Sequence, residues 1–208
     1  MFVCFEGIDG AGKSTQARML QQRLAKDGVA VELVADPGTT KIGTAIRQIL
    51  LHNDDPISPA AQMLLFSAAR AELAAHIKGL LADNQTVICD RWLLSTLVYQ
   101  GEINNISAEL ITHIFCETSH VRPDICFLLD IAPEDAQRRM GKPRDRYERR
   151  CAEEQNRMRL AYTTHAQQRP HAAVVHHINA DRDPEDTHNE IYALYSRACR
   201  AELIANTP

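Results

Sequence analysis

Short runs of apolar and β-branched residues alternate along the chain with longer stretches in which apolar positions recur at helical spacing. The apolar runs are continuous, which is typical of strands that are buried on both faces of a parallel sheet with helical crossovers. Five strands are predicted, at residues 2–7, 30–35, 86–90, 124–130 and 173–178. Helices are predicted at residues 13–27, 41–52, 58–82, 92–100, 107–119, 133–141, 148–168 and 184–204. This pattern predicts a three-layer α/β fold with a five-stranded parallel sheet flanked by helices.

Three helix boundaries carry recognisable signals. Ser58 precedes Pro59 and Asp183 precedes Pro184, so each pair offers a capping oxygen followed by a proline at the first helical position. Gly28 follows the first predicted helix, where a left-handed backbone is least costly for glycine. These signals support the predicted helix limits.

The composition is that of a globular protein. The 208 residues fit one domain, residues 1–208, and no apolar run is long enough to cross a bilayer. The first residues lack the basic region of a signal peptide, and the six cysteines contain no C-x-x-C pair, which favours free thiols. A net charge of −4 disfavours a nucleic-acid polymer as partner. We expect a cytoplasmic protein with no membrane association.

The strongest motif, G-x-x-x-x-G-K-[ST], lies between the first strand and the first helix. Its glycines allow backbone N–H groups to surround a phosphate, Lys13 neutralises oxygens of the outer phosphates, and Ser14 can ligate magnesium. The motif comprises Gly7, Ile8, Asp9, Gly10, Ala11, Gly12, Lys13, Ser14 and Thr15. The sequence therefore predicts a P-loop NTPase fold that binds a nucleoside triphosphate together with Mg²⁺.

The residues after the third strand restrict the reaction. A switch GTPase needs an N-K-x-D motif to read its base, and the sequence contains none. A motor ATPase usually ends this strand in Asp-Glu to polarise water, whereas this strand ends in Asp90 and Arg91. An arginine cannot activate water as a base but is well suited to hold a second anion. A phosphate-bearing acceptor is the simplest candidate.

The order of several further segments resembles that of the thymidylate kinases. The segments are FEGIDGAGKST, DPGTT, the F-x-x-x-R of Phe66 and Arg70, DRWLLSTLVYQG, RPDICFLLDIAPEDAQRR and DRYE. The resemblance implies transfer of the ATP γ-phosphate to dTMP, giving ADP and dTDP. It also implies a homodimer formed through helices of the first half; the apolar face of residues 58–82 allows this, but a buried internal helix would look the same.

The resemblance assigns roles around the acceptor. It implies that Phe66 stacks on thymine, that Arg70 bonds a base carbonyl and that Arg91 holds the acceptor phosphate. Asp9 would reach the 3′-hydroxyl or the magnesium shell, Ser14 and Asp90 would hold the metal, and Ala180 would contact adenine. The remaining acceptor residues are Asp36, Ser95, Thr96, Tyr99 and Gln100.

The segment 141–150 is predicted to be a lid. Its charges are five basic and two acidic, a local balance of +3, from Lys142, Arg144, Arg146, Arg149 and Arg150 against Asp145 and Glu148. Such a run is also typical of a solvated helix face. By resemblance, Arg144 and Arg146 join Lys13, Asp9 and Arg91 as catalytic residues, while Arg149 and Arg150 are interpreted as structural.

The chain departs from the family pattern after the second strand. Relatives commonly have Arg-Glu-Pro-Gly-Gly-Thr there, whereas residues 35–40 read ADPGTT, with no basic residue and a shorter acid. This change bears on acceptor affinity and identity. Two alternatives therefore stay open: a related kinase for another monophosphate or a deoxynucleoside, the latter with Glu6 as its base, and a nucleotide sensor without turnover.

Overall fold

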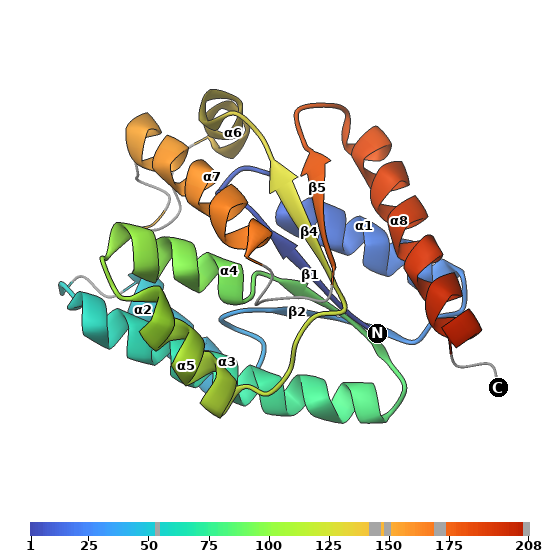
Figure 1. The fold of residues 1–208 in the computed structure, drawn as a ribbon, viewed down its shortest axis with the longest axis horizontal. Coiled ribbons are helices and arrows are strands. Elements are labelled where there is room, and N and C mark those ends of the chain that lie inside the picture. The colour runs from blue at the N-terminus through green and yellow to red at the C-terminus, as the bar shows by residue number, and fades with distance from the viewer. Residues whose placement is uncertain (53–54, 142–146, 148–150, 169–173, 206–208) are drawn as a thin grey trace.

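The computed structural model describes residues 1–52, 55–141, 147, 151–168 and 174–205. Within these residues the chain forms one five-stranded sheet in the order β2-β3-β1-β4-β5, and every neighbouring pair is parallel (Figure 1). The strands are β1 Phe2–Glu6, β2 Val31–Ala35, β3 Thr86–Asp90, β4 Ile125–Asp130 and β5 Val174–Asn179. The α/β prediction is confirmed, and each predicted strand lies within one residue of its observed limits.

Helices cover both faces of the sheet. On one face α1 packs against α8, while α7 packs against β4 and α3 against β3. In Figure 1, α6 lies beside the upper end of β4. The helices are α1 Lys13–Lys26, α2 Lys41–His52, α3 Pro59–Ala82, α4 Leu93–Thr96, α5 Ala108–Thr118, α6 Pro133–Met140, α7 Ala152–Gln167 and α8 Pro184–Ala205. The helix predicted at 148–168 is observed from Ala152 onward, and residues 148–150 lie outside the described part of the chain.

The predicted helix boundaries hold in detail. The Ser58 hydroxyl accepts a hydrogen bond from the backbone N–H of Ala61, and an Asp183 carboxylate oxygen accepts one from that of Glu185. Gly28 has φ +80°, the left-handed conformation expected where a helix ends. All six cysteines are free thiols, as predicted. None of the helices in the described residues is long and apolar enough to cross a membrane.

Burial differs between the centre and the edges of the sheet. Every residue of β1 is buried, and β3 and β4 are buried except for their last residues. The prediction that all strands are buried on both faces is wrong for the edge strands: β2 is mostly half-buried, and Val174 of β5 is 47% exposed. An edge strand has a sheet neighbour on only one side, so apolar residues there are covered incompletely.

The helix predicted at residues 92–100 is not uniform. After α4 the chain continues as a π-helical segment, η1, from Leu97 to Ile103. Such wide turns are rare and occur frequently at functional sites. Here the segment joins two residues of the predicted site, Tyr99 and Gln100, to the end of α4.

The carboxyl ends of the five parallel strands lie along one edge of the sheet, where α/β proteins usually bind ligands. The phosphate loop follows β1, the DPGTT loop follows β2, and Arg91 follows β3. The sheet order therefore places three segments of the predicted site side by side, although up to 84 positions separate them in the sequence.

A bidentate ion pair ties α7 to the end of β4. Arg159 Nε lies 2.6 Å from Asp130 Oδ1 and Arg159 Nη2 lies 2.7 Å from Asp130 Oδ2. The hydrogen bonds from Arg159 hold the pKa of Asp130 below its usual value of 3.8. The pair should therefore stabilise the fold fully above pH 3.8 and lose this contribution as the pH falls through the lowered pKa.

We expect Asp130→Asn to lower the free energy of unfolding by about 0.5–1 kcal/mol at neutral pH, the upper range for a largely exposed ion pair. Urea titrations at pH 7 and at several values below 4 measure the difference between the variant and the unchanged protein. The difference should shrink as the pH falls; a constant difference would contradict this assignment.

Candidate functional site

A cavity of about 910 Å³ opens at the carboxyl edge of the sheet. Its lining includes most of the residues predicted for the site: Asp9, Gly10, Ala11, Gly12, Lys13, Ser14, Thr15, Asp36, Phe66, Arg70, Asp90, Arg91, Ser95, Thr96, Tyr99, Gln100 and Ala180. Gly7 and Ile8, the first two residues of the phosphate loop, line a separate, very small cavity instead. Arg144 and Arg146 lie outside the described residues, as do Lys142, Arg149 and Arg150.

The phosphate loop needs glycine at two positions for different reasons. A Cβ on Gly10 would lie 2.3 Å from the carbonyl oxygen of Ala136, so α6 leaves no room for a side chain. A Cβ on Gly12 would meet nothing within 4 Å, but its φ of +92° is a conformation that side chains disfavour. The loop ends at the first turn of α1, whose N–H groups lie beside the cavity and suit an anion.

Lys13 is buried, and its Nζ donates to the carbonyl oxygen of Ile8 at 2.7 Å. Burial, together with the nearby charge of Arg91, lowers the pKa of Lys13 to about 8. A bound polyphosphate would add negative charge at this place and favour the protonated amine. The Lys13 amine is therefore placed where its protonated form can bind phosphate oxygens.

The two residues predicted to hold a metal lie in contact. Ser14 Oγ donates a short hydrogen bond to Asp90 Oδ2 at the end of β3. Within the described residues no group of three or more His, Cys, Asp or Glu side chains could hold a metal. A hydroxyl, one carboxylate and substrate phosphates are nevertheless the oxygen ligands that Mg²⁺ normally takes, so the donor set fits this ion.

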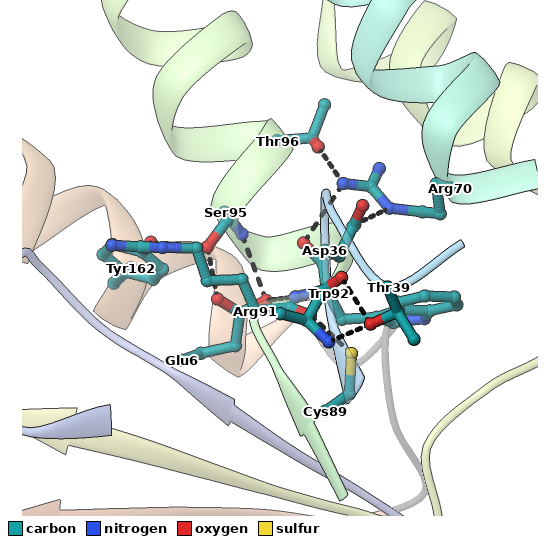
Figure 2. Close-up of polar contacts among 11 residues, drawn as sticks. Glu6, Asp36, Thr39, Arg70, Cys89, Arg91, Trp92, Ser95, Thr96 and Tyr162 are labelled. Atoms are coloured by element: carbon teal, nitrogen blue, oxygen red, sulfur yellow. Dashed lines mark hydrogen bonds and ion pairs between the residues drawn. The ribbon is translucent and has the colours of Figure 1, made fainter. Parts of the chain in front are cut away.

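Arg91 occupies the centre of the site. Its backbone has φ +73°, unusual for a residue with a side chain. Nη1 donates to the carbonyl oxygen of Gly7 at 3.2 Å. It also donates to the hydroxyls of Ser95 and Tyr162, both at 3.1 Å (Figure 2). Nη2 forms a short ion pair with Asp9. One edge of the guanidinium is thus held by the protein interior, while the other meets a carboxylate that lines the cavity.

Asp9 also accepts a hydrogen bond from Tyr99, whose Oη lies 2.7 Å from Asp9 Oδ2. Burial raises the pKa of Tyr99, so its hydroxyl stays protonated and donates. The Tyr99 ring centroid lies 5.2 Å from the guanidinium carbon of Arg91, within the range of a cation–π contact. Asp9, Tyr99 and Arg91 therefore form one cluster at the cavity wall.

A second ion pair, which is buried, forms the deeper wall. Arg70 Nε donates to Asp36 Oδ2 at 2.5 Å, and Arg70 Nη2 donates to Thr96 Oγ1 at 2.5 Å (Figure 2). Burial raises the pKa of Asp36, and the charge and hydrogen bond of Arg70 oppose that shift. Arg70 Nη1 makes no hydrogen bond within the described residues, so it remains available to a ligand in the cavity.

Three aromatic rings surround this part of the cavity. The ring of Tyr147 lies 6.0 Å from that of Phe66 and 6.1 Å from that of Tyr99, both in edge contacts, and its hydroxyl donates to Gln62 at 3.0 Å. The Nε2 of the buried Gln100 has no hydrogen-bond partner among the described residues. The surroundings suit a flat ring that carries polar edges.

Several cavity residues were not predicted. Arg47 on α2 donates from Nη1 to the carbonyl oxygen of Pro37 at 2.7 Å, which returns a positive charge to the DPGTT loop. Arg139 on α6 donates to the carbonyl oxygen of Ala180 at 2.9 Å. Arg139 and Tyr147 both belong to segments that resemble the thymidylate kinases, RPDICFLLDIAPEDAQRR and DRYE, but neither residue was singled out. Arg47 carried no sequence signal beyond its place on an amphipathic helix.

The structure disfavours Glu6 as a base. Its side chain is completely buried, it is absent from the cavity lining, and it accepts hydrogen bonds from the backbone N–H groups of Trp92 and Ser95 and from the Ser95 hydroxyl. A carboxylate held in this way has no access to a substrate hydroxyl. The reading as a deoxynucleoside kinase with Glu6 as its base loses its support.

Comparisons with known proteins identify the family of this chain. A family model described as thymidylate kinase matches residues 5–191. A thymidylate kinase of Prosthecochloris aestuarii is 40% identical, with 92% of this chain and 91% of that protein covered. One of Chlorobium chlorochromatii is 38% identical, with 93% of each covered. A crystal structure of thymidylate kinase from Ehrlichia chaffeensis is 30% identical with a TM-score of 0.76, covering 94% of this chain and 98% of that one. The chain belongs to the thymidylate kinase family.

Proposed function

We propose that this protein transfers the γ-phosphate of ATP to dTMP and releases ADP and dTDP. One observation carries the proposal: a single cavity contains the phosphate loop at one end and, beside it, an arginine followed by an aromatic pocket. This arrangement suits two anions facing each other with a flat base beyond the second. Phosphoryl transfer asks a protein mainly to position such groups and to neutralise their charge.

The donor end comprises the phosphate loop and α1. In our proposal the loop N–H groups and Lys13 hold the β- and γ-phosphates, and adenine lies near Ala180, where Arg139 fixes the backbone. Ser14 and Asp90 would hold Mg²⁺, which neutralises charge on the phosphates when bound. The ion pair of Arg159 with Asp130 would keep α7 in place beside this region.

The acceptor end centres on Arg91. We assign its Nη2 edge to the dTMP phosphate, which would compete with Asp9 for the guanidinium. The released Asp9 carboxylate, still bonded to Tyr99, could then accept from the 3′-hydroxyl or a water of the magnesium shell. The Nη1 edge would stay bound to Gly7, Ser95 and Tyr162 throughout.

The base pocket accounts for the preference for thymine in this proposal. Phe66 would stack on the ring, Arg70 Nη1 would donate to a base carbonyl, and the unpartnered Gln100 Nε2 would donate at another edge. A donor from Arg70 suits a carbonyl and disfavours the exocyclic amine of cytosine. Thr96 and Asp36 would fix the arginine rather than contact the base.

We further propose that residues 1–208 form one domain, that the segment 141–150 acts as its lid, and that Arg144 and Arg146 contact the transferring phosphate. We also propose a cytoplasmic location, which the six free thiols support.

A homodimer through α2 and α3 is supported by three large apolar side chains, Ile42, Ile49 and Leu64, which are 52%, 45% and 57% exposed. Light scattering at several concentrations should give twice the 23.3 kDa chain mass.

An ADP-release assay tests the reaction. The purified protein is supplied with ATP, Mg²⁺ and one acceptor from a panel of dTMP, dUMP, dCMP, dAMP, dGMP and thymidine. We expect the highest kcat/KM with dTMP and no turnover of thymidine. Faster turnover of thymidine would favour a nucleoside kinase, and ATP binding without ADP release on any acceptor would favour a nucleotide sensor.

A further inference from the structure

Glu6, the last residue of β1, makes its hydrogen bonds below the cavity. Oε1 accepts from the backbone N–H of Trp92 at 2.8 Å and from that of Ser95 at 3.2 Å, while Oε2 accepts from the Ser95 hydroxyl at 2.5 Å (Figure 2). All three donors belong to Trp92 and α4, which directly follow Arg91. A carboxylate in a fully buried position is costly unless such partners satisfy it, so these contacts need an explanation beyond packing.

The residues that Glu6 holds directly follow a strained residue. Arg91 has φ +73°, and strain of this kind persists only where surrounding contacts enforce it. The N–H of Arg91 donates to the carbonyl oxygen of Phe5 at 3.0 Å, and the next N–H, that of Trp92, donates to Glu6. The side chain of Trp92, the N-cap residue of α4, makes no capping hydrogen bond. The carboxylate of Glu6, at the end of β1, caps the helix instead by accepting from the backbone N–H of Ser95.

A second route links Glu6 to the guanidinium itself. The Ser95 hydroxyl accepts a hydrogen bond from Arg91 Nη1 at 3.1 Å and donates one, through its single hydrogen, to Glu6 Oε2 at 2.5 Å. The hydroxyl thereby becomes a better acceptor toward Arg91, since hydrogen bonds in a buried chain polarise one another. Tyr162 Oη, 2.9 Å from Ser95 Oγ, closes the cluster on the remaining side.

We propose that Glu6 is a positioning residue, which fixes the backbone of Arg91 through Trp92 and its guanidinium through Ser95, and so presents Nη2 to the phosphate of the acceptor. The inference rests on the proposed function, because it takes Arg91 as the phosphate ligand. Glu6 touches no substrate. A residue that only stabilised the fold would affect every ligand alike, whereas Glu6 should affect the acceptor phosphate selectively.

The test compares two ligands that differ in that phosphate. Calorimetry measures the Kd of dTMP and of thymidine, the nucleoside without phosphate, for the unchanged protein and for Glu6→Gln. Glutamine keeps an oxygen for the two backbone N–H groups but presents an amide NH₂, which cannot accept the Ser95 proton. We expect dTMP to bind about tenfold to a hundredfold more weakly, as when a supporting residue is lost. The Kd values of thymidine and of a non-hydrolysable ATP analogue should change by less than about twofold.

Ser95→Ala provides a second variant if Glu6→Gln fails to fold, because it also removes the contact between Glu6 and the Arg91 guanidinium. It should weaken the binding of dTMP and leave that of thymidine unchanged. In the double variant the losses should not add, since both changes remove one interaction. Thr86→Val is the matched control: Thr86 is buried at the opposite end of β3, with its hydroxyl 3.4 Å from Tyr195 Oη. It should leave the Kd of both ligands unchanged.

An equal loss for dTMP and thymidine would overturn the inference and leave Glu6 a structural cap, and so would an unchanged Kd of dTMP. Failure of the proposed function looks different, because the unchanged protein itself would then show no dTMP-dependent release of ADP. The two hypotheses are therefore separated by measurements on different proteins.

Discussion

Replacing Arg91 with alanine is expected to lower kcat/KM for dTMP by about a thousandfold while the Kd of an ATP analogue changes by less than about threefold. Removing one partner of a buried, charge-assisted contact typically costs about 2–5 kcal/mol, and each 1.4 kcal/mol is a factor of ten. The loss here has two sources. The acceptor phosphate loses its guanidinium, and the Asp9 carboxylate keeps its negative charge beside that phosphate without the compensating ion pair.

Steady-state kinetics with each substrate varied in turn, together with calorimetry of the ATP analogue, measure these effects. Arg91→Lys should recover only part of the activity, because an ammonium cannot bind Asp9 or phosphate with one edge and Gly7, Ser95 and Tyr162 with the other. Arg138→Ala, at an arginine 77% exposed on α6, is the matched control and should behave like the unchanged protein. If ATP binding fell as far as dTMP binding, the assignment of the two ends of the cavity would be wrong.

Lys13→Ala is expected to lower kcat/KM for ATP by about a hundredfold to a thousandfold, the range seen when one preorganised donor is removed from a site of developing charge. The Kd of dTMP should change little, since Arg91 and the aromatic pocket remain. The loss of activity should not be accompanied by a loss of thermal stability. Burial lowers the pKa of Lys13 to about 8, which means that the fold disfavours the charged amine in the absence of phosphate.

Thermal unfolding and kinetics on the same preparations separate these effects. We expect the Tm of Lys13→Ala to equal or exceed that of the unchanged protein, with activity nearly lost. Lys26→Ala, at an exposed lysine at the far end of the same helix, should alter neither quantity. A variant that lost activity only because it unfolded would instead show a clearly lower Tm, and that result would remove the evidence for a role in phosphate binding.

Most of the cavity wall was predictable because the residues that line it are near neighbours in the chain. The phosphate loop spans nine consecutive residues, and the segment after β3 carries Arg91, Ser95, Thr96, Tyr99 and Gln100 within ten. Local spacing was sufficient to identify these groups. It did not predict the wider turn of η1, a segment that packs against α5 and α7.

The pairing of the charges was not predictable in the same way. Asp36 was predicted to bind the substrate; it lines the cavity, and its pairing with Arg70, 34 positions away, was not predicted. Arg47 was not singled out, yet it lies against the loop that lacks the family's usual arginine. Glu6 was considered as a base, but it accepts hydrogen bonds from Trp92 and Ser95, which lie 86 and 89 positions further along the chain. None of these contacts has a periodicity that a sequence pattern could reveal.

The sequence by itself determined the succession of strands and helices, the phosphate loop between β1 and α1, and the resemblance to the thymidylate kinases. These properties follow from local propensity, from hydrophobic periodicity and from motifs whose spacing has a direct physical purpose. Only the tertiary structure decided which carboxylate each arginine meets. The reason is the sheet order: β1 lies between β3 and β4 with Phe5 opposite Asp90, so Glu6 and Asp9 come to lie beside Arg91.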